Sequence, residues 1–118
     1  MKRLLLLVAG ACFSMAPAAL AQSGTIDAEP NPCHMEGRDT CTTFVRWETQ
    51  GVAAAKVFVI AEGRHTFQEK EFSASLHCER HRCAADWIRP ETRYIFKLYD
   101  FTRGDRGRLL GSVTISGR

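Results

Sequence analysis

Apolar and polar side chains alternate in the stretch from Trp87 to Asp100, which carries the clearest secondary-structure signal in the chain. Pro90 marks a turn. Two sets of residues then alternate: Tyr94, Phe96 and Leu98 with Ile95, Lys97 and Tyr99. A period of two is typical of a β-strand with one buried face. We expect the rest of the domain to pack around this strand, with Trp87 and Tyr94 in the core.

Other short segments carry strand patterns and are separated by turn residues. They cover residues 25–28, 42–49, 55–61, 66–72 and 109–116, whereas residues 73–86 are expected to be irregular. In the second segment, Thr43, Val45 and Trp47 share one face, which we expect to be buried. No helical period of any length follows residue 21. The pattern predicts an all-β protein, an antiparallel sandwich of about seven strands.

The first 21 residues have the features of an export signal. Lys2 and Arg3 supply positive charge, residues 4–13 form an apolar run, and residues 19–21 offer small side chains to a signal peptidase. The apolar run is too short to span a bilayer comfortably as a helix. We therefore expect cleavage before Gln22 and a single mature domain over residues 22–118, without membrane insertion.

Cys12 leaves a second interpretation of the N-terminus open. It follows Ala9-Gly10-Ala11, which is a poor version of a bacterial lipoprotein box. Lipidation of Cys12 would anchor the protein to a membrane. Cleavage before Gln22 would instead give a periplasmic or secreted protein.

The charge of the mature chain is close to neutral. The whole chain has 16 Lys and Arg against 13 Asp and Glu, a net charge of +3. Without Lys2 and Arg3 the balance is 14 against 13, or about +1. Composition therefore gives no reason to expect nucleic acid or an anionic membrane as a partner.

Four cysteines remain after the predicted signal: Cys33, Cys41, Cys78 and Cys83. An even number of cysteines in a small exported domain is typical of a disulfide framework. Three pairings are compatible with four cysteines. We favour Cys33–Cys41 and Cys78–Cys83, because the members of each pair are close in sequence and flank a plausible loop.

The aromatic residues carry a resemblance to a known type of domain. Trp47 in an early strand, Trp87-Ile88-x-Pro90, and the alternation up to Tyr99 resemble a fibronectin type III or immunoglobulin-like domain of bacterial secreted proteins. In such domains a Tyr soon after a Pro forms the tyrosine corner, in which the phenol hydrogen-bonds to nearby backbone. The resemblance implies this role for Tyr94. It implies no binding residues, because this fold supports many functions.

The stretch from His77 to Cys83 is the most unusual in the chain. Its centre contains three basic residues, Arg80, His81 and Arg82. A Cys78–Cys83 disulfide would stiffen this loop, so that its basic tip could enter a partner's cleft or meet an acidic surface. One alternative is a metal site that uses His77 and His81, since imidazole suits zinc or copper. The other is an ordinary solvated loop.

A second basic loop lies between the last two predicted strands and contains Arg103, Arg106 and Arg108. We expect Arg106 to extend the basic patch of Arg80 and Arg82 if the two loops share an end of the domain. The alternative is a solvated turn, which the two glycines of the loop favour. No aromatic residues are interleaved with these arginines, so single-stranded nucleic acid is not an expected partner.

Some large apolar residues fall on predicted outer faces of the sandwich: Phe44, Phe58, Ile60 and Tyr99. An exposed aromatic patch of this kind would bind sugar rings or another protein. The alternative is that loops or further strands cover these side chains.

The sequence contains no recognisable catalytic constellation. The serines lack a nucleophile-elbow context, the acidic residues form no recognisable pair, and oxidised cysteines offer no thiolate. We expect an exported binding module, with no enzymatic activity and no cofactor. Its expected partner is an envelope or extracellular protein or glycan, contacted through the Cys78–Cys83 loop. The alternatives are a small envelope metal-binding protein and a purely structural module.

Overall fold

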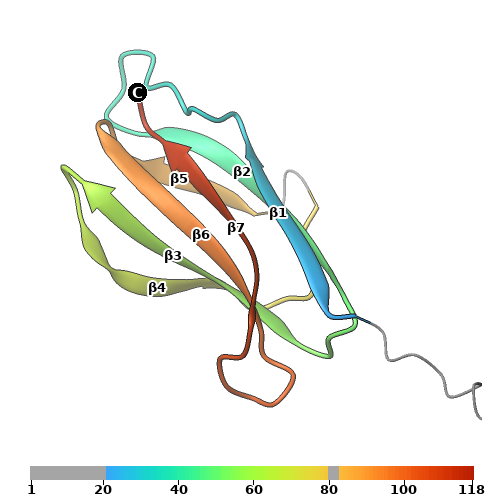
Figure 1. The fold of residues 1–118 in the computed structure, drawn as a ribbon. Coiled ribbons are helices and arrows are strands. Elements are labelled where there is room, and N and C mark those ends of the chain that lie inside the picture. Colours follow the sequence, from blue (N-terminus) through green and yellow to red (C-terminus); the bar gives the residue numbers. More distant parts are fainter. Residues whose placement is uncertain (1–20, 80–82) are drawn as a thin grey trace, which may run out of the picture.

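The computed structural model describes residues 21–79 and 83–118, which form seven β-strands and no helix (Figure 1). The strands are β1 (Ser23–Glu29), β2 (Cys41–Gln50), β3 (Ala55–Gly63), β4 (Phe67–Ser73), β5 (Ala84–Ile88), β6 (Thr92–Asp100) and β7 (Leu109–Ser116). Among these residues, no helix has the length and apolar character needed to cross a bilayer. The predicted export signal and Cys12 lie in residues 1–20, outside the described part of the chain.

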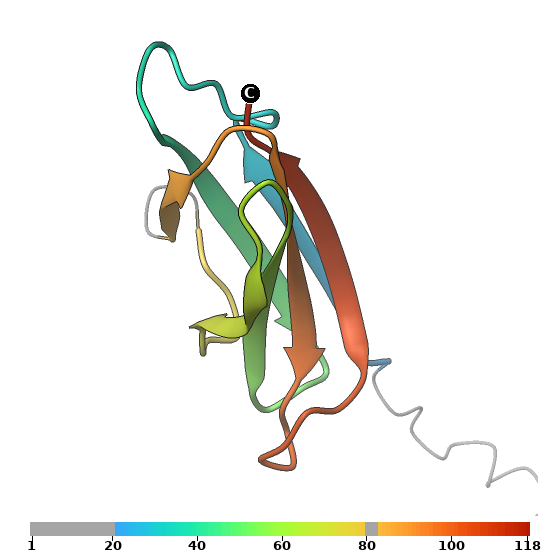
Figure 2. The same cartoon turned by 90° about the vertical axis from the view of Figure 1, so that its left-hand side faces the viewer.

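The strands form two antiparallel sheets that pack face to face. One has the order β1-β2-β5 and the other β4-β3-β6-β7. This confirms the predicted all-β sandwich of about seven strands. The edge strands β1 and β7 lie side by side, as Figure 1 shows. The opposite edge strands, β4 and β5, lie on the side that faces the viewer in Figure 2.

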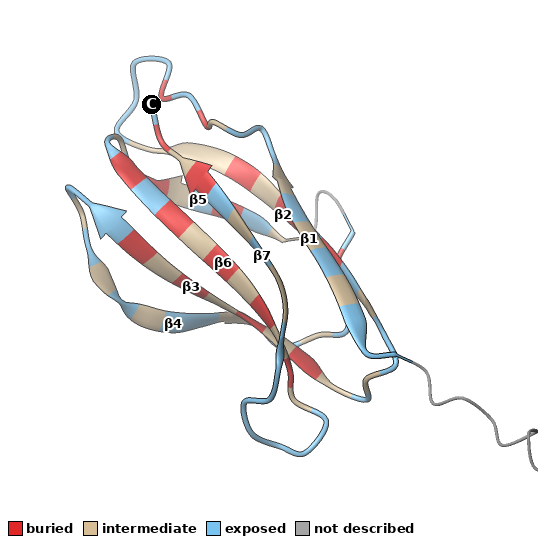
Figure 3. Cartoon of the chain, viewed as in Figure 1, coloured by how far each residue is buried: buried red, intermediate tan, exposed pale blue. Residues whose placement is uncertain are grey.

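The core lies between the two sheets and follows the alternation of the strands (Figure 3). Thr43, Val45 and Trp47 of β2 are buried, and the side chain of Phe96 in β6 is fully buried. The predicted inward faces of these two strands are therefore confirmed. The apolar run of β3 is explained by its interior position in the four-stranded sheet, where Val57 and Val59 are buried and Phe58 and Ile60 are half-buried.

The structure corrects two expectations for the segment before β6. Residues 84–86, predicted to be irregular, belong to β5, which pairs with β2 through Ala84, Ala85 and Ile88. Trp87, predicted to be buried, is only half-buried, although it packs against the core. The physical reason is that β5 is an edge strand, so that its side chains lack a covering strand on one side.

The cysteines pair as predicted, Cys33 with Cys41 and Cys78 with Cys83. The first disulfide connects the two sheets. Cys41 begins β2, whereas the backbone N–H of Cys33 donates to the carbonyl of Ser116 in β7 (2.8 Å). The second disulfide lies along β2, because the carbonyls of Cys78 and Cys83 accept from the N–H groups of Trp47 and Val45. Two disulfides indicate an oxidising compartment, either extracellular or periplasmic.

Candidate ligand-binding groove

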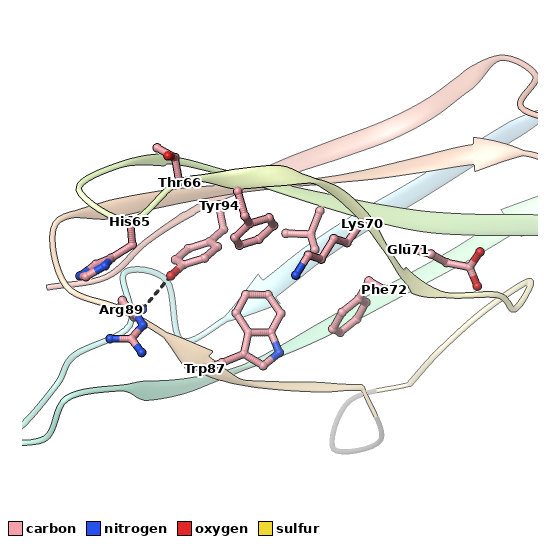
Figure 4. Close-up of a pocket in the computed structure, with 10 residues that line it drawn as sticks. His65, Thr66, Lys70, Glu71, Phe72, Trp87, Arg89 and Tyr94 are labelled. Carbon is pink, nitrogen blue, oxygen red and sulfur yellow. Dashed lines mark hydrogen bonds between the residues drawn. The ribbon is translucent and has the colours of Figure 1, made fainter.

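A groove runs between the edge strands β4 and β5, which belong to different sheets and do not pair with each other. It lies on the open side of the sandwich. It has a volume of about 620 Å³, within the range of small-molecule sites. Both sheets contribute to its walls. The residues that line it are Val59, His65, Thr66, Phe67, Lys70, Glu71, Phe72, Trp87, Arg89 and Tyr94 (Figure 4).

Aromatic rings form the floor of the groove, with Trp87 at their centre. Its ring lies nearly parallel to that of Phe96 (24°, centroids 6.1 Å apart) and meets the rings of Phe67, Phe72 and Tyr94 closer to edge-on. These ring contacts fix the position of the Trp87 indole from the side that faces the core. The half-buried Trp87 therefore offers apolar surface to the groove from a fixed position.

The indole N–H groups of the two tryptophans differ. Nε1 of Trp47 donates to the carbonyl of Ser75 (3.0 Å), whereas Nε1 of Trp87 has no acceptor among the described residues. Trp87 therefore has a donor available to a ligand, and its indole resonance can be distinguished from that of Trp47 in a binding experiment.

Irregular pairing of β4 turns its side chains toward the groove. Val59 of β3 pairs with Lys70, and Ala61 pairs with Phe67, so β4 contains one more residue than β3 between these two pairs. Such a β-bulge changes which side chains face inward. Because Val59 and Ala61 are both buried, the bulge places both Phe67 and Lys70 on the groove side of β4.

Three basic residues line the groove. Lys70 lies on β4, Arg89 directly follows β5, and His65 precedes β4. None of these three side chains forms an ion pair with a carboxylate of the described residues. The Lys70 ammonium instead lies 5.2 Å from the centroid of the Phe67 ring. The three groups can therefore interact with an anion from solution.

The acidic residues of β4 form ion pairs with basic residues outside the groove. Glu71 pairs with Lys56 (3.0 Å), and Glu69 pairs with Arg106 (2.6 Å) and Lys97 (3.8 Å). Figure 4 shows the Glu71 carboxylate directed away from the aromatic rings. The carboxylates of this strand therefore leave the basic groups in the groove without a partner.

Tyr94 connects the core to the end of the groove at which Arg89 lies. It is 2% exposed, and its hydroxyl accepts a hydrogen bond from the backbone N–H of Arg89 (2.9 Å). This is the contact implied for a tyrosine corner. In Figure 4, His65 and Arg89 lie beside Tyr94, and Lys70 lies farther along the groove, above Trp87.

The predicted partner-binding residues Arg80, His81 and Arg82 lie outside the described residues, so their contact with a partner stays a prediction. His77 and Glu79, beside them, are exposed. Cys78 and Cys83 form a disulfide, which leaves no thiolate for a metal. Within the described residues, no three His, Cys, Asp or Glu side chains gather in a way that would hold a metal ion.

Arg106 lies on the outer face of the four-stranded sheet. Its guanidinium lies 4.5 Å from the centroid of the Phe58 ring and 4.3 Å from that of Tyr99, in addition to its ion pair with Glu69. Phe58 and Tyr99 are therefore half-buried and partly covered by a loop. This was the alternative to an exposed aromatic patch. The loop that carries Arg106 joins two strands of the four-stranded sheet, whereas Cys78 and Cys83 lie along β2 of the other sheet.

The loop that carries Arg106 begins at a charged turn. The Asp100 carboxylate accepts hydrogen bonds from the hydroxyl (2.6 Å) and the backbone N–H (2.8 Å) of Thr102. These two bonds, the hydroxyl first, hold the pKa of Asp100 below its usual value. The ionised Asp100 therefore fixes the direction in which the chain leaves β6.

Comparisons with protein-family models, with curated proteins and with solved structures find no match for this chain. Its function must be inferred from its own residues. The sequence interpretation did not identify the groove, because Phe67, Lys70 and Phe72 belong to a weak strand pattern and Trp87 was expected in the core. Arg89 is also far from His65 and Lys70 in the sequence.

Proposed function

We propose that this chain is an exported, non-catalytic binding domain that holds the apolar part of a ligand in the groove between β4 and β5. The main support is the half-buried Trp87, which is fixed by four surrounding rings and lines a cavity of about 620 Å³. Apolar sites with a few polar groups at their margins are typical of small-molecule binding.

Further observations support export and a function other than catalysis. The disulfides fit an oxidising compartment, and the signal-like residues 1–21 fit secretion to the periplasm or the medium. The groove carboxylate, Glu71, is paired with Lys56, so it does not form an acid–base pair with His65 or Lys70. The membership in a fibronectin type III or immunoglobulin-like family stays a prediction.

A neutral apolar probe tests this function. We expect 4-phenylbutan-1-ol to shift the indole N–H resonance of Trp87 and to leave that of Trp47 unchanged, because Trp47 is 1% exposed. Trp87→Ala should weaken binding at least about tenfold, or about 1.4 kcal/mol, as measured by NMR titration of backbone amides.

Leu109→Ala is the matched control. Leu109 is also a large apolar residue at the surface (47% exposed), but it lies on β7, away from the groove. This variant should bind the probe like the unmodified protein. The proposal would be wrong if the probe did not shift groove resonances, or if the two variants weakened binding equally.

A further inference from the structure

The basic groups of the groove form no ion pair with the described residues that would explain their positions. Lys70 is an exposed residue on a bulged strand, and the Arg89 guanidinium forms no ion pair or hydrogen bond with the described residues. Both nevertheless lie beside a surface of aromatic rings. A ligand that matches this arrangement must combine an apolar body with negative charge.

We propose that the ligand of the groove is a small apolar carboxylic acid, a refinement that rests on the proposed function. Its carboxylate faces Arg89 and His65 at one end of the groove, Lys70 adds positive charge farther along, and its apolar body lies on Trp87. Charge-assisted hydrogen bonds of a Lys or Arg cation with a carboxylate are stronger than those between neutral groups. The low dielectric of the aromatic floor strengthens this attraction relative to water.

The shape of β4 favours a small acid over an extended peptide. A peptide that joined a sheet would need a regular row of free backbone groups along the edge. The pairing of β4 with β3 shifts at two places, between the partners of Val57 and Phe58 and between those of Val59 and Ala61. Bulges and an exposed Lys are features that prevent strand addition at an edge. The ligand is therefore held by side chains rather than by a β-ladder.

The size of the cavity agrees with this ligand class. About 620 Å³ accommodates a single ligand of drug-like size. The rings of Phe67 and Phe72 flank Trp87, so a phenyl or short aliphatic chain can contact three rings at once. The indole N–H of Trp87 supplies one further donor for an oxygen of the ligand.

The test compares two probes that share a phenylalkyl body and differ at one end, where one has a carboxylate and the other a neutral alcohol. We expect the purified protein to bind 4-phenylbutanoate at least tenfold more tightly than 4-phenylbutan-1-ol at pH 7 and low salt, by NMR titration followed at Trp87. Lys70→Gln and Arg89→Gln should each reduce this preference at least threefold. Arg103→Gln removes an exposed cation of the β6–β7 loop that forms no hydrogen bond or ion pair with the described residues, and it should preserve the preference.

The outcomes separate this inference from the proposed function. Equal binding of acid and alcohol in the groove would overturn the carboxylate inference and leave an apolar binding site. Failure of both probes to bind would overturn both. A third probe, the free acid of acetyl-Ala-Ala-Phe, tests a peptide terminus as the ligand. Tighter binding of this peptide than of 4-phenylbutanoate would overturn the assignment to a small acid.

Discussion

At the scale of single residues, Tyr94 contributes both to the packing of the core and to the position of a groove residue. Its ring lies 5.3 Å from that of Trp87, and its hydroxyl accepts the backbone N–H of Arg89. Arg89 leaves β5 just before the turn at Pro90, so this bond fixes the backbone that carries the Arg89 guanidinium. Tyr94 is therefore a positioning residue for the basic end of the groove.

Tyr94→Phe tests this role. It removes the acceptor of a part-buried N–H while retaining the ring, so the free energy of unfolding should fall by about 1–2 kcal/mol, measured by urea denaturation. Tyr99→Phe is the matched control, because the Tyr99 hydroxyl has no hydrogen-bond partner among the described residues. It should change stability by less than about 0.5 kcal/mol. Equal effects of the two changes would contradict the role assigned to the Tyr94 hydroxyl.

Residue-scale prediction from the sequence succeeds where alternation reports burial. The pattern of residues 94–99 correctly placed Tyr94 and Phe96 inside, because a strand covered on one face buries every second side chain. Trp87 was misplaced, since a pattern cannot show whether a strand lies at an edge. The sequence pattern also could not predict the orientation of Lys70, because this orientation depends on a bulge that arises from pairing with β3.

At the scale of elements, the β6–β7 loop folds back onto the sheet that it connects. Asp100 directs the chain out of β6, and Arg106 returns to cover the rings of Phe58 and Tyr99. The pairing of β6 with β7 shifts beside this loop, between Leu98 and Tyr99. The sequence located the loop and its arginines, but only the fold shows that Arg106 has partners within the protein.

Arg106→Ala tests whether the loop stabilises the sheet. It removes two cation–π contacts and the ion pair with Glu69, so we expect a loss of about 0.5–1.5 kcal/mol in the free energy of unfolding. Arg103→Ala, in the same loop, should change it by less than about 0.5 kcal/mol. The comparison uses urea denaturation at low and high salt, and the effect of Arg106→Ala should shrink as salt rises.

An unchanged stability of Arg106→Ala would show that its contacts contribute little and that the side chain is free to bind a partner. That result would favour the prediction from the sequence that Arg106 is part of a basic binding patch. A loss specific to Arg106 would instead support a structural role for this arginine.

At the scale of the whole molecule, the sandwich is closed on one side and open on the other. β1 and β7 lie side by side, whereas β4 and β5 leave the groove between them. The first disulfide also ties the two sheets together at one end, because Cys41 begins β2 and the backbone N–H of Cys33 donates to the carbonyl of Ser116 in β7. The Cys78–Cys83 disulfide makes no such link, since both of its cysteines hydrogen-bond to β2.

Removing each disulfide in turn tests this difference. The loops close over 8 and 5 residues, so the chain-entropy model gives each about 2–2.5 kcal/mol. Cys33→Ala with Cys41→Ala should cost about 1 kcal/mol more than Cys78→Ala with Cys83→Ala, because Cys33 is fully buried and its bond joins the two sheets. Urea denaturation of both double variants measures the costs. If the second pair proved the more costly, the bond along β2 would be the main covalent stabiliser, and the groove beside β5 would depend on it.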